Sequence, residues 1–157
     1  RFDQDNLICR KLHDGSFALY AGRGYDKRHG VPASAAEIAG HRFIAPRGDR
    51  TPPQLIDWMA GHVDPDQVVM SCEDWPALIT AIQSGIGIGA AATAFRDEKD
   101  EMIHCFDLPE STGYTTMLLA NAQAYQRPEV KAFIAFFAPR YTALARAQRR
   151  SARKAAD

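Results

Sequence analysis

Short apolar runs alternate along most of the chain with segments in which apolar residues recur at helical spacing. The runs are bounded by turn-forming residues and have the length of strands, whereas a stripe such as Leu78, Ile79 and Ile82 is typical of a helix with one buried face. The pattern predicts strands over residues 7–9, 17–21, 41–45, 67–70, 86–92, 102–108 and 114–121. It predicts helices over residues 25–29, 35–39, 75–84 and 93–99, one that starts at Pro52 and one that opens at Pro128. This alternation indicates an α/β fold in which helices cover a sheet.

Local signals predict where several of these helices begin. Asp74 fits the N-cap of the helix over residues 75–84, because its side chain can accept a hydrogen bond from the first turn. Ser34 and Glu37 have the spacing of a capping box. Thr51 stands where it could cap the next helix. All three signals depend only on residues that are close together in the sequence.

The last helix carries an uneven share of the charge. The chain has 19 basic and 19 acidic residues, but residues 128–157 hold seven basic and two acidic ones. A basic end can bind nucleic acid or an acidic surface, and it can equally be a solvated helix end that frays. We expect residues 151–157 to be a disordered basic tail, and Pro139 to kink or restart the helix. The expected buried stripe is Val130, Phe133, Ile134, Phe137, Tyr141 and Leu144.

Length and composition narrow the class of protein. A chain of 157 residues with 46% apolar residues is long enough to bury its own core. No apolar run approaches the roughly 20 residues of a membrane span, so no membrane partner is expected. Residues 1–5 are polar and unlike a secretory signal, and the chain does not begin with Met. We therefore expect an internal fragment of a longer cytoplasmic protein.

The three cysteines do not form a disulfide framework, because they are few, odd in number and far apart. Reduced thiols are typical of a cytoplasmic protein. Cys72 is followed by two acidic residues, which disfavour its thiolate and argue against a nucleophile. Cys9 and Cys105 are expected to be core residues. These features predict that the protein is not an enzyme.

Two further patterns do not predict a site, one in the histidines and one in the glycines. The five histidines lack metal-ligand spacing, so neither a metal nor another cofactor is expected. Gly85 to Ala90 match the G-x-G-x-x-A fingerprint of dinucleotide-binding sites. That fingerprint should follow a strand and open a helix, whereas here a helix precedes it and a strand follows. Helix capping at Gly85 and close backbone packing at Gly87 and Gly89 explain the glycines instead.

An ordered set of short patterns carries more information than any one of them. The patterns are Leu7-x-x-Arg10-x-Leu12, Leu19-Tyr20-Ala21-x-x-x-Tyr25-x-x-x-His29-Gly30-x-Pro32, Ala36-Glu37-Ile38-Ala39-Gly40-His41-Arg42-Phe43-Ile44, Ala77-Leu78-x-x-Ala81-x-x-x-Gly85-x-Gly87-Ile88 and Pro128-Glu129-Val130-Lys131-Ala132-Phe133-Ile134-x-Phe136-Phe137. In this order and at these spacings the chain resembles the effector-binding domain of LysR-type transcriptional regulators, from about residue 7 to about residue 138.

The resemblance implies a two-lobed fold of the periplasmic-binding-protein-like type II class, as a fragment lacking the opening part of the first lobe. Residues 1–21 would be the trailing part of lobe I, residues 22–116 the complete lobe II, and residues 117–150 the return to lobe I. The implied partners are a small-molecule effector, DNA through an N-terminal helix-turn-helix domain that this chain lacks, and further copies in a homodimer or homotetramer.

The resemblance also implies a site, in which the effector binds between the lobes. The candidate contacts are Gly22, Ser71, Cys72, Glu73, Ala90 and Ala91, with Asp74 as a structural helix cap. A helix N-terminus attracts carboxylates, but Glu73 and Asp74 oppose a second negative charge. A neutral, zwitterionic or cationic effector is therefore equally possible. Arg47, Asp49 and Arg50 belong either to a solvated loop or to the edge of the site.

Two alternatives from other classes stay open. The first is a solute-binding domain of the same fold with no DNA-binding partner domain. The second is a small enzyme that uses the region of Cys72. A helix-turn-helix encoded upstream would favour the regulator over the first alternative, and retention of all activity by Cys72→Ala would exclude the second.

Overall fold

The computed structural model describes residues 7–94 and 102–154. The chain divides into two compact units. The larger unit is Ser16–Tyr114, and the smaller unit combines Arg1–Gly15 with Thr115–Asp157.

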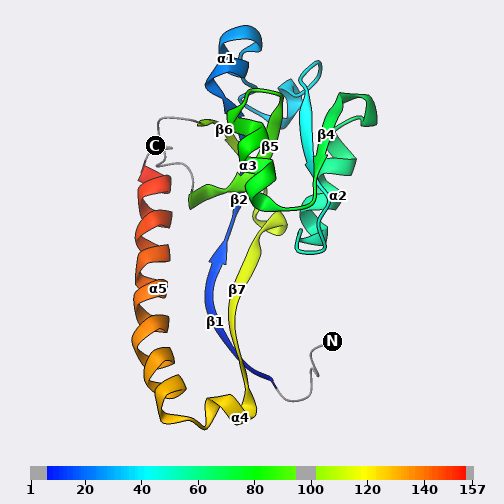
Figure 1. The fold of residues 1–157 in the computed structure, drawn as a ribbon. Coiled ribbons are helices and arrows are strands. Elements are labelled where there is room, and N and C mark those ends of the chain that lie inside the picture. Colours follow the sequence, from blue (N-terminus) through cyan, green and yellow to red (C-terminus); the bar gives the residue numbers. More distant parts are fainter. Residues whose placement is uncertain (1–6, 95–101, 155–157) are drawn as a thin grey trace. The chain divides into compact units, whose positions relative to one another are not determined.

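A mixed sheet forms the centre of the larger unit (Figure 1). Within the described residues it has five strands in the order β4-β3-β5-β2-β6. The strands are β2 (Phe17–Gly22), β3 (Phe43–Pro46), β4 (Val68–Cys72), β5 (Ile88–Ala92) and β6 (Met102–Asp107). Strand β3 is parallel to both β4 and β5, whereas β2 is antiparallel to β5 and β6. The sheet is therefore mixed, with β4 at one edge.

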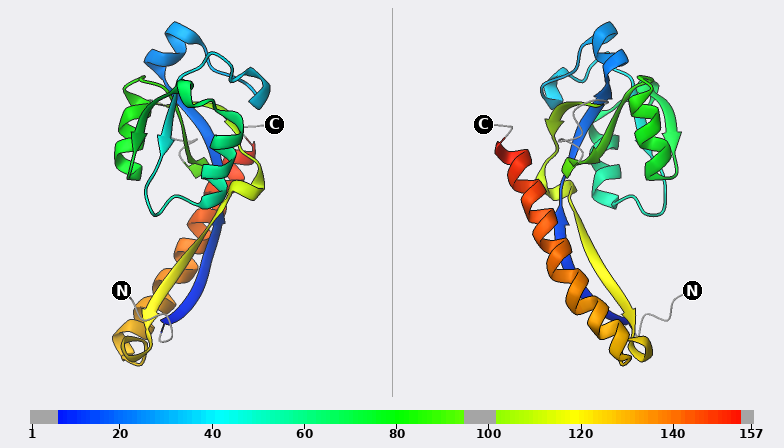
Figure 2. Two further views of the ribbon diagram at one scale, coloured as in Figure 1. Left: turned by 90° about the vertical axis from the view of Figure 1, so that its right-hand side faces the viewer. Right: turned by 60° about the vertical axis from the view of Figure 1, so that its left-hand side comes forward.

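Helices cover both faces of this sheet (Figure 2). They are α1 (Arg23–His29), α2 (Pro53–His62) and α3 (Trp75–Gln83), and short 3-10 turns lie in the connections at Ala35–Glu37, Pro65–Gln67 and Glu110–Thr112. Every residue of β2 is buried, and successive side chains point to opposite faces. Leu19 packs in one core with Leu55 of α2, and Tyr20 packs in the other with Ile82 of α3. Burial on both faces explains why β2 is apolar without alternation.

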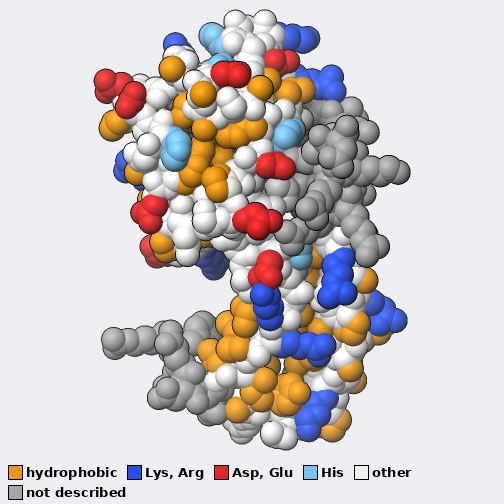
Figure 3. All heavy atoms as spheres, turned by 180° about the vertical axis from the view of Figure 1, so that it is seen from behind, with side chains coloured by type: hydrophobic (Ala, Val, Ile, Leu, Met, Phe, Trp, Pro, Cys, Tyr) orange, Lys and Arg blue, Asp and Glu red, His pale blue; other side chains and the backbone are white. Residues whose placement is uncertain are grey.

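The smaller unit pairs β1 (Leu7–Gly15) with β7 (Tyr114–Asn121) in a sheet of two strands among the residues described. Helix α4 (Ala122–Tyr125) leads into α5 (Pro128–Lys154), which packs on β1. Ile134 and Ala138 of α5 are buried, and the Thr142 hydroxyl donates to the Leu12 carbonyl at 3.0 Å. Figure 3 shows many hydrophobic side chains left at the surface of this unit.

Several local predictions are confirmed and others are wrong. The strand expected over residues 114–121 matches β7. The helix expected over residues 35–39 is one 3-10 turn, in which Glu37 accepts from the Ala33 N–H at 3.0 Å. Gly40 has a φ of +81°, a backbone conformation that cannot continue a right-handed helix, so the helical segment before it is short. The helix expected over residues 93–99 falls mostly outside the described residues.

Thr51 does not cap α2. Pro52 is the N-cap residue and makes no side-chain cap bond, while the Thr51 N–H donates to the Gly48 carbonyl at 2.8 Å. Thr51 belongs instead to a turn that closes the preceding loop.

Three predictions for the smaller unit are wrong in whole or in part. Helix α5 runs through Pro139 as one helix, so it does not restart there, although the proline has no N–H to donate to the preceding turn. It extends to Lys154, so residues 151–154 of the predicted tail are helical, and residues 155–157 lie outside the described residues. Cys9 is exposed rather than in a core, because only Leu12 of β1 is buried.

Candidate functional site: the rim of the larger unit

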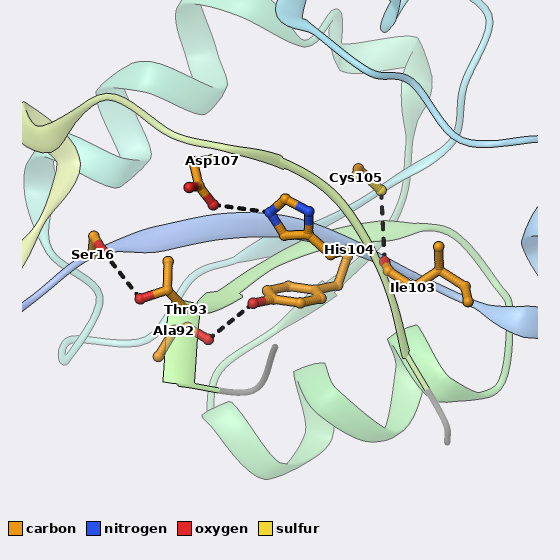
Figure 4. A network of polar contacts seen from close by, with 8 residues as sticks. Ser16, Ala92, Thr93, Ile103, His104, Cys105 and Asp107 are labelled. Carbon is orange, nitrogen blue, oxygen red and sulfur yellow. Dashed lines mark hydrogen bonds and ion pairs between the residues drawn. The ribbon is translucent and has the colours of Figure 1, made fainter. Parts of the chain in front are cut away.

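The carboxyl ends of β3, β4 and β5 lie at the same end of the sheet, because these strands run parallel. We call this end of the sheet the rim and define it as Ser16, residues 46–51, residues 71–74 and Thr93. The start of β2 joins it through Ser16, whose hydroxyl lies 3.1 Å from the Thr93 hydroxyl and whose carbonyl accepts from the Thr93 N–H at 2.9 Å (Figure 4). In open α/β sheets, ligands bind at the carboxyl ends of the strands.

The loop after β3 is held against the end of β4. The Arg47 N–H donates to the Cys72 carbonyl at 2.8 Å. A Cβ at Gly48 would lie 1.9 Å from the Glu73 carbonyl oxygen, so a side chain does not fit there. Gly48 therefore permits the close approach that positions the loop, a role that sequence reasoning missed. A glycine among charged residues directly after a strand was the available signal.

Asp74 is the N-cap of α3. Its backbone is extended at φ −130°, and its carboxylate accepts from the Ala77 N–H at 2.7 Å. Pro76 has no N–H to offer. Of the first-turn donors in this described helix only the Trp75 N–H is left, and it directly follows two acidic residues, Glu73 and Asp74, in the sequence. This helix end is consequently a poor site for an anion.

A small hollow lies at the rim on the α3 face of the sheet. Its lining residues are Pro46, Arg50, Thr51, Cys72, Glu73, Asp74, Trp75 and Leu78. Its volume is about 10 Å³, which is room for roughly one water molecule. Trp75 borders it as a half-buried ring stacked on Phe17, with centroids 5.5 Å apart. The charged lining comprises one guanidinium and two carboxylates.

The Cys72 thiol is buried at this hollow. Burial raises its pKa, and the nearby Asp74 charge raises it further. Burial likewise raises the pKa of Cys105 to about 12. Both thiols are protonated at neutral pH, which weakens any nucleophilic role.

The structure brings only part of the expected site together. Ser71, Cys72 and Glu73 lie at the rim, but Ser71 and Cys72 are on opposite sides of β4, because side chains alternate along a strand. Ser71 lines a groove beside α2, and Cys72 lines the hollow beside α3.

The other three expected contacts lie elsewhere. Ala90 and Ala91 are fully buried in the two cores. Gly22 lies at the opposite end of β2, where a Cβ would be 2.4 Å from the Ile82 carbonyl oxygen. Gly22 thus permits the packing of α3 on β2. At the rim, the residues next to the ends of β2 and β5 are Ser16 and Thr93.

The neighbouring polar contacts stabilise the β2, β5 and β6 ends of the sheet (Figure 4). His104 Nε2 lies 2.9 Å from Asp107 Oδ1, and the Tyr20 hydroxyl donates to the Ala92 carbonyl at 3.4 Å. Among the residues described, no group of three or more His, Cys, Asp or Glu side chains could hold a metal ion. No helix in the described part of the chain is long and apolar enough to cross a membrane.

Comparison with known families identifies the domain. The family model for the LysR substrate binding domain matches residues 1–142, so the chain belongs to this family. Its fold is of the periplasmic-binding-protein-like type II class. No curated protein sequence matches the chain significantly.

Solved structures show the same fold. The regulatory domain of CrgA, a LysR-type transcriptional regulator from Neisseria meningitidis, has a TM-score of 0.68 at 17% identity, covering 90% of this chain and 72% of that one. Full-length AphB, a virulence activator from Vibrio cholerae, gives 0.60 at 18% identity, covering 87% and 48%. CbnR, a LysR family transcriptional regulator, gives 0.63 at 11% identity, covering 90% and 48%. The chain spans about half the length of such full-length regulators.

Proposed function

We propose that the chain is the effector-sensing domain of a LysR-type DNA-binding transcriptional regulator. Membership of the LysR substrate binding domain family carries this proposal. The rim supports it, because three parallel strands end there and the capped helix α3 begins there. The domain is not an enzyme in this proposal, in keeping with the protonated thiol of Cys72.

The effector contacts the rim around Glu73 and the loop of residues 46–51. Two carboxylates oppose one guanidinium in the hollow, and the α3 end has few free N–H donors. These features favour a zwitterionic or cationic metabolite over an anion. The hollow admits only about one water molecule, so the side chains that line it have to move apart when the effector binds.

The regulatory step follows from differential binding. An effector shifts an equilibrium between two conformations only if it binds one of them more tightly, and about 1–3 kcal/mol is typical of such coupling. The readout is DNA binding by a helix-turn-helix domain of the same protein, in a cytoplasmic homodimer or homotetramer.

The reading frame that encodes this chain tests the regulator assignment. A helix-turn-helix and a linker helix upstream of Arg1 are expected. A secretory signal there would contradict the proposal and favour a solute-binding domain of the same fold.

A ligand screen tests the rim. Thermal unfolding of the chain is measured with zwitterionic, cationic, neutral and anionic metabolites, and hits are repeated with Glu73→Gln. The matched control is Asp66→Asn, an exposed acidic position outside the rim. We expect Glu73→Gln to reduce the shift in Tm and Asp66→Asn to leave it unchanged. Equal responses of the two variants would exclude Glu73 as an effector contact.

A further inference from the structure

One surface loop of the larger unit has two ends that meet at a buried side chain. Gly30 and Gly40 bound this loop with φ of +67° and +81°, a conformation that glycine adopts readily. Each glycine stands next to a histidine, His29 before the loop and His41 after it. Both imidazoles pack on the Tyr25 ring of α1, with centroid distances of 4.9 Å for His29 and 5.9 Å for His41. We call this segment the Gly30–Gly40 loop, and its close ends are typical of an Ω-loop.

The Tyr25 hydroxyl holds the base of the loop closed. It accepts from the Arg42 N–H at 2.9 Å and lies 3.1 Å from His41 Nδ1. The single hydroxyl hydrogen is directed at Nδ1, which accepts it only when that nitrogen is unprotonated. Tyr25 is buried, so water does not readily replace a lost partner there. The closed base therefore requires a neutral His41.

The other contacts of the loop involve an uncharged side chain. Gln67 Nε2 donates to the carbonyls of Ile38 and His41 at 2.9 and 3.0 Å. Ile38 is also buried in the core that Leu55 and Trp58 share. An amide does not titrate, so these contacts stay in place when the pH changes. A pH-dependent change is thus confined to the base of the loop.

The charges around the base change with pH. Both histidines become cations on acidification and then repel each other across Tyr25. Burial lowers the pKa of His41, the His29 charge lowers it further, and Glu37 in the loop raises it. The remaining charged side chains on the elements around His41 are Arg42, then Arg23, Asp26, Lys27 and Arg28 on α1, and Asp64 and Asp66 beside Gln67. All of these are exposed except the half-buried Asp26, so solvent screens most of their charge.

The sign of the pH dependence follows from these contacts. The closed loop binds a proton at His41 less readily than an open loop does, because the pKa of His41 is lowered in the closed form. The stability of the closed base is fully present above pH 6.5 and is lost as the pH falls through that lowered pKa.

We infer that the Gly30–Gly40 loop opens reversibly at its base under mildly acidic conditions, when His29 and His41 are protonated. Opening separates the Tyr25 hydroxyl from its two partners, and the flanking glycines absorb the change in backbone angles. The base lies just before β3, whereas the rim lies at the other end of that strand. This acid-sensitive device is therefore independent of effector binding at the rim.

Hydrogen exchange of single amides, measured by NMR on the full chain at pH 7.5 and 5.5, tests the inference. Protection factors correct for the pH dependence of the intrinsic exchange rate. Those of the His41 and Arg42 N–H should fall roughly three- to tenfold at pH 5.5, as expected for the loss of one hydrogen bond. Unchanged protection at both amides would overturn the inference.

Urea separates local opening from global unfolding. A local opening exposes little surface, so about 1 M urea should leave the protection of the Arg42 N–H unchanged. The Val63 and Leu108 amides, which bond to carbonyls elsewhere in the larger unit, should lose protection roughly tenfold or more. An equal urea response at Arg42 would show exchange through global unfolding and would contradict a local opening.

Variants assign the opening to the histidines. His41→Gln keeps an uncharged acceptor beside Tyr25 and should largely remove the pH difference at the Arg42 N–H. His29→Gln removes the second cation and should reduce that difference in part. The matched control His62→Gln, at an exposed position on α2, should keep it in full. An undiminished difference in His41→Gln would exclude His41 as the controlling group.

The hydroxyl is tested separately by Tyr25→Phe. This variant should show low protection of the Arg42 N–H at both pH values, because the acceptor is absent. PH-dependent protection that persists in folded Tyr25→Phe would overturn the role of the hydroxyl. The amide spectrum checks folding of every variant, and the two histidine variants alone decide the inference if Tyr25→Phe does not fold, since His29 is exposed and His41 only half-buried.

Discussion

Strand β2 of the larger unit and strand β7 of the smaller unit are both rich in apolar residues, but their surroundings differ. Every residue of β2 is buried, because helices cover both faces of its sheet. In β7, Met117 is 44% exposed and Leu119 57%. Helix α5 shows the same contrast, since Ile134 is buried and Phe133 is 57% exposed. An apolar pattern thus predicts which faces suit burial, and whether they are covered depends on neighbouring elements.

The exposed apolar surface of the smaller unit is too extensive to be a scatter of single residues. Phe133, Phe136 and Leu144 of α5 are all more than half exposed. Phe136 is partly covered by the Arg140 guanidinium, which lies 3.7 Å from its ring centroid. Such surfaces mark interaction sites in soluble proteins, and the oligomer proposed above would be one way to cover this one.

The largest effect on the free energy of unfolding is expected when a large apolar side chain is truncated to alanine in the larger unit, and a similar truncation in the smaller unit is the comparison. Ile82→Ala removes a fully buried side chain of α3 and should cost about 2–5 kcal/mol of the free energy of unfolding. Leu119→Ala, at an exposed position on β7, should change it by less than about 0.5 kcal/mol. Urea unfolding followed by circular dichroism measures both. A comparable loss in the two variants would show that β7 is covered in solution.

A second pair compares two glycines of the larger unit. Gly48→Ala forces a Cβ against the Glu73 carbonyl and should cost about 1–3 kcal/mol. Gly61→Ala, in the last turn of α2, meets no atom within 4 Å and should stabilise the helix by about 0.5–1 kcal/mol. Thermal unfolding gives the sign of each change. A neutral Gly48→Ala variant would mean that the loop of residues 46–51 is not held against β4.

The helix caps give a smaller contrast between the units. Asp74→Ala removes the bond to the Ala77 N–H and should destabilise α3 by about 1 kcal/mol. Asn121 caps α4 in the smaller unit through the Gln123 N–H at 2.8 Å, but that helix has only four residues. Asn121→Ala should therefore cost less than Asp74→Ala, as measured by urea unfolding. The reverse order would show that the α3 cap is not important for stability.

Local features of the fold could be predicted from the sequence, and non-local ones could not. The Asp74 cap and the β7 strand depend on residues close in sequence, and both are found in the structure. The position of β4 at the sheet edge depends on strand order, which no local pattern encodes. Thr51 was expected to cap α2, but its N–H closes a turn with Gly48 in the loop held against Glu73.

The contrast between local and non-local features also explains why only part of the expected site lies together in the structure. Ser71, Cys72 and Glu73 are adjacent in sequence and were expected to act together. Alternation along β4 assigns Ser71 to the groove beside α2 and Cys72 to the hollow beside α3. The groove itself arises only because β4 is an edge strand beside α2, so residues from three separate segments had to be placed in space before it could be found.

The smallest expected effect is a pH dependence within the larger unit. The Tyr25 hydroxyl accepts from the Arg42 N–H at 2.9 Å and lies 3.1 Å from His41 Nδ1. The tyrosine hydrogen is then directed at Nδ1, which must be unprotonated to accept it. Burial lowers the pKa of His41 below its usual value of 6.5, and the nearby His29 lowers it further.

The folded state therefore binds a proton at His41 less readily than the unfolded chain does. The stability that depends on neutral His41 is fully present above pH 6.5 and falls as the pH drops through the lowered pKa of the folded state. Urea midpoints at pH 7.5 and 5.5 should differ in the native chain, and the difference should shrink in His41→Gln. The control His62→Gln, on α2, should keep it. An unchanged difference in His41→Gln would assign the pH dependence to other groups and leave the Tyr25–His41 bond without a role in stability.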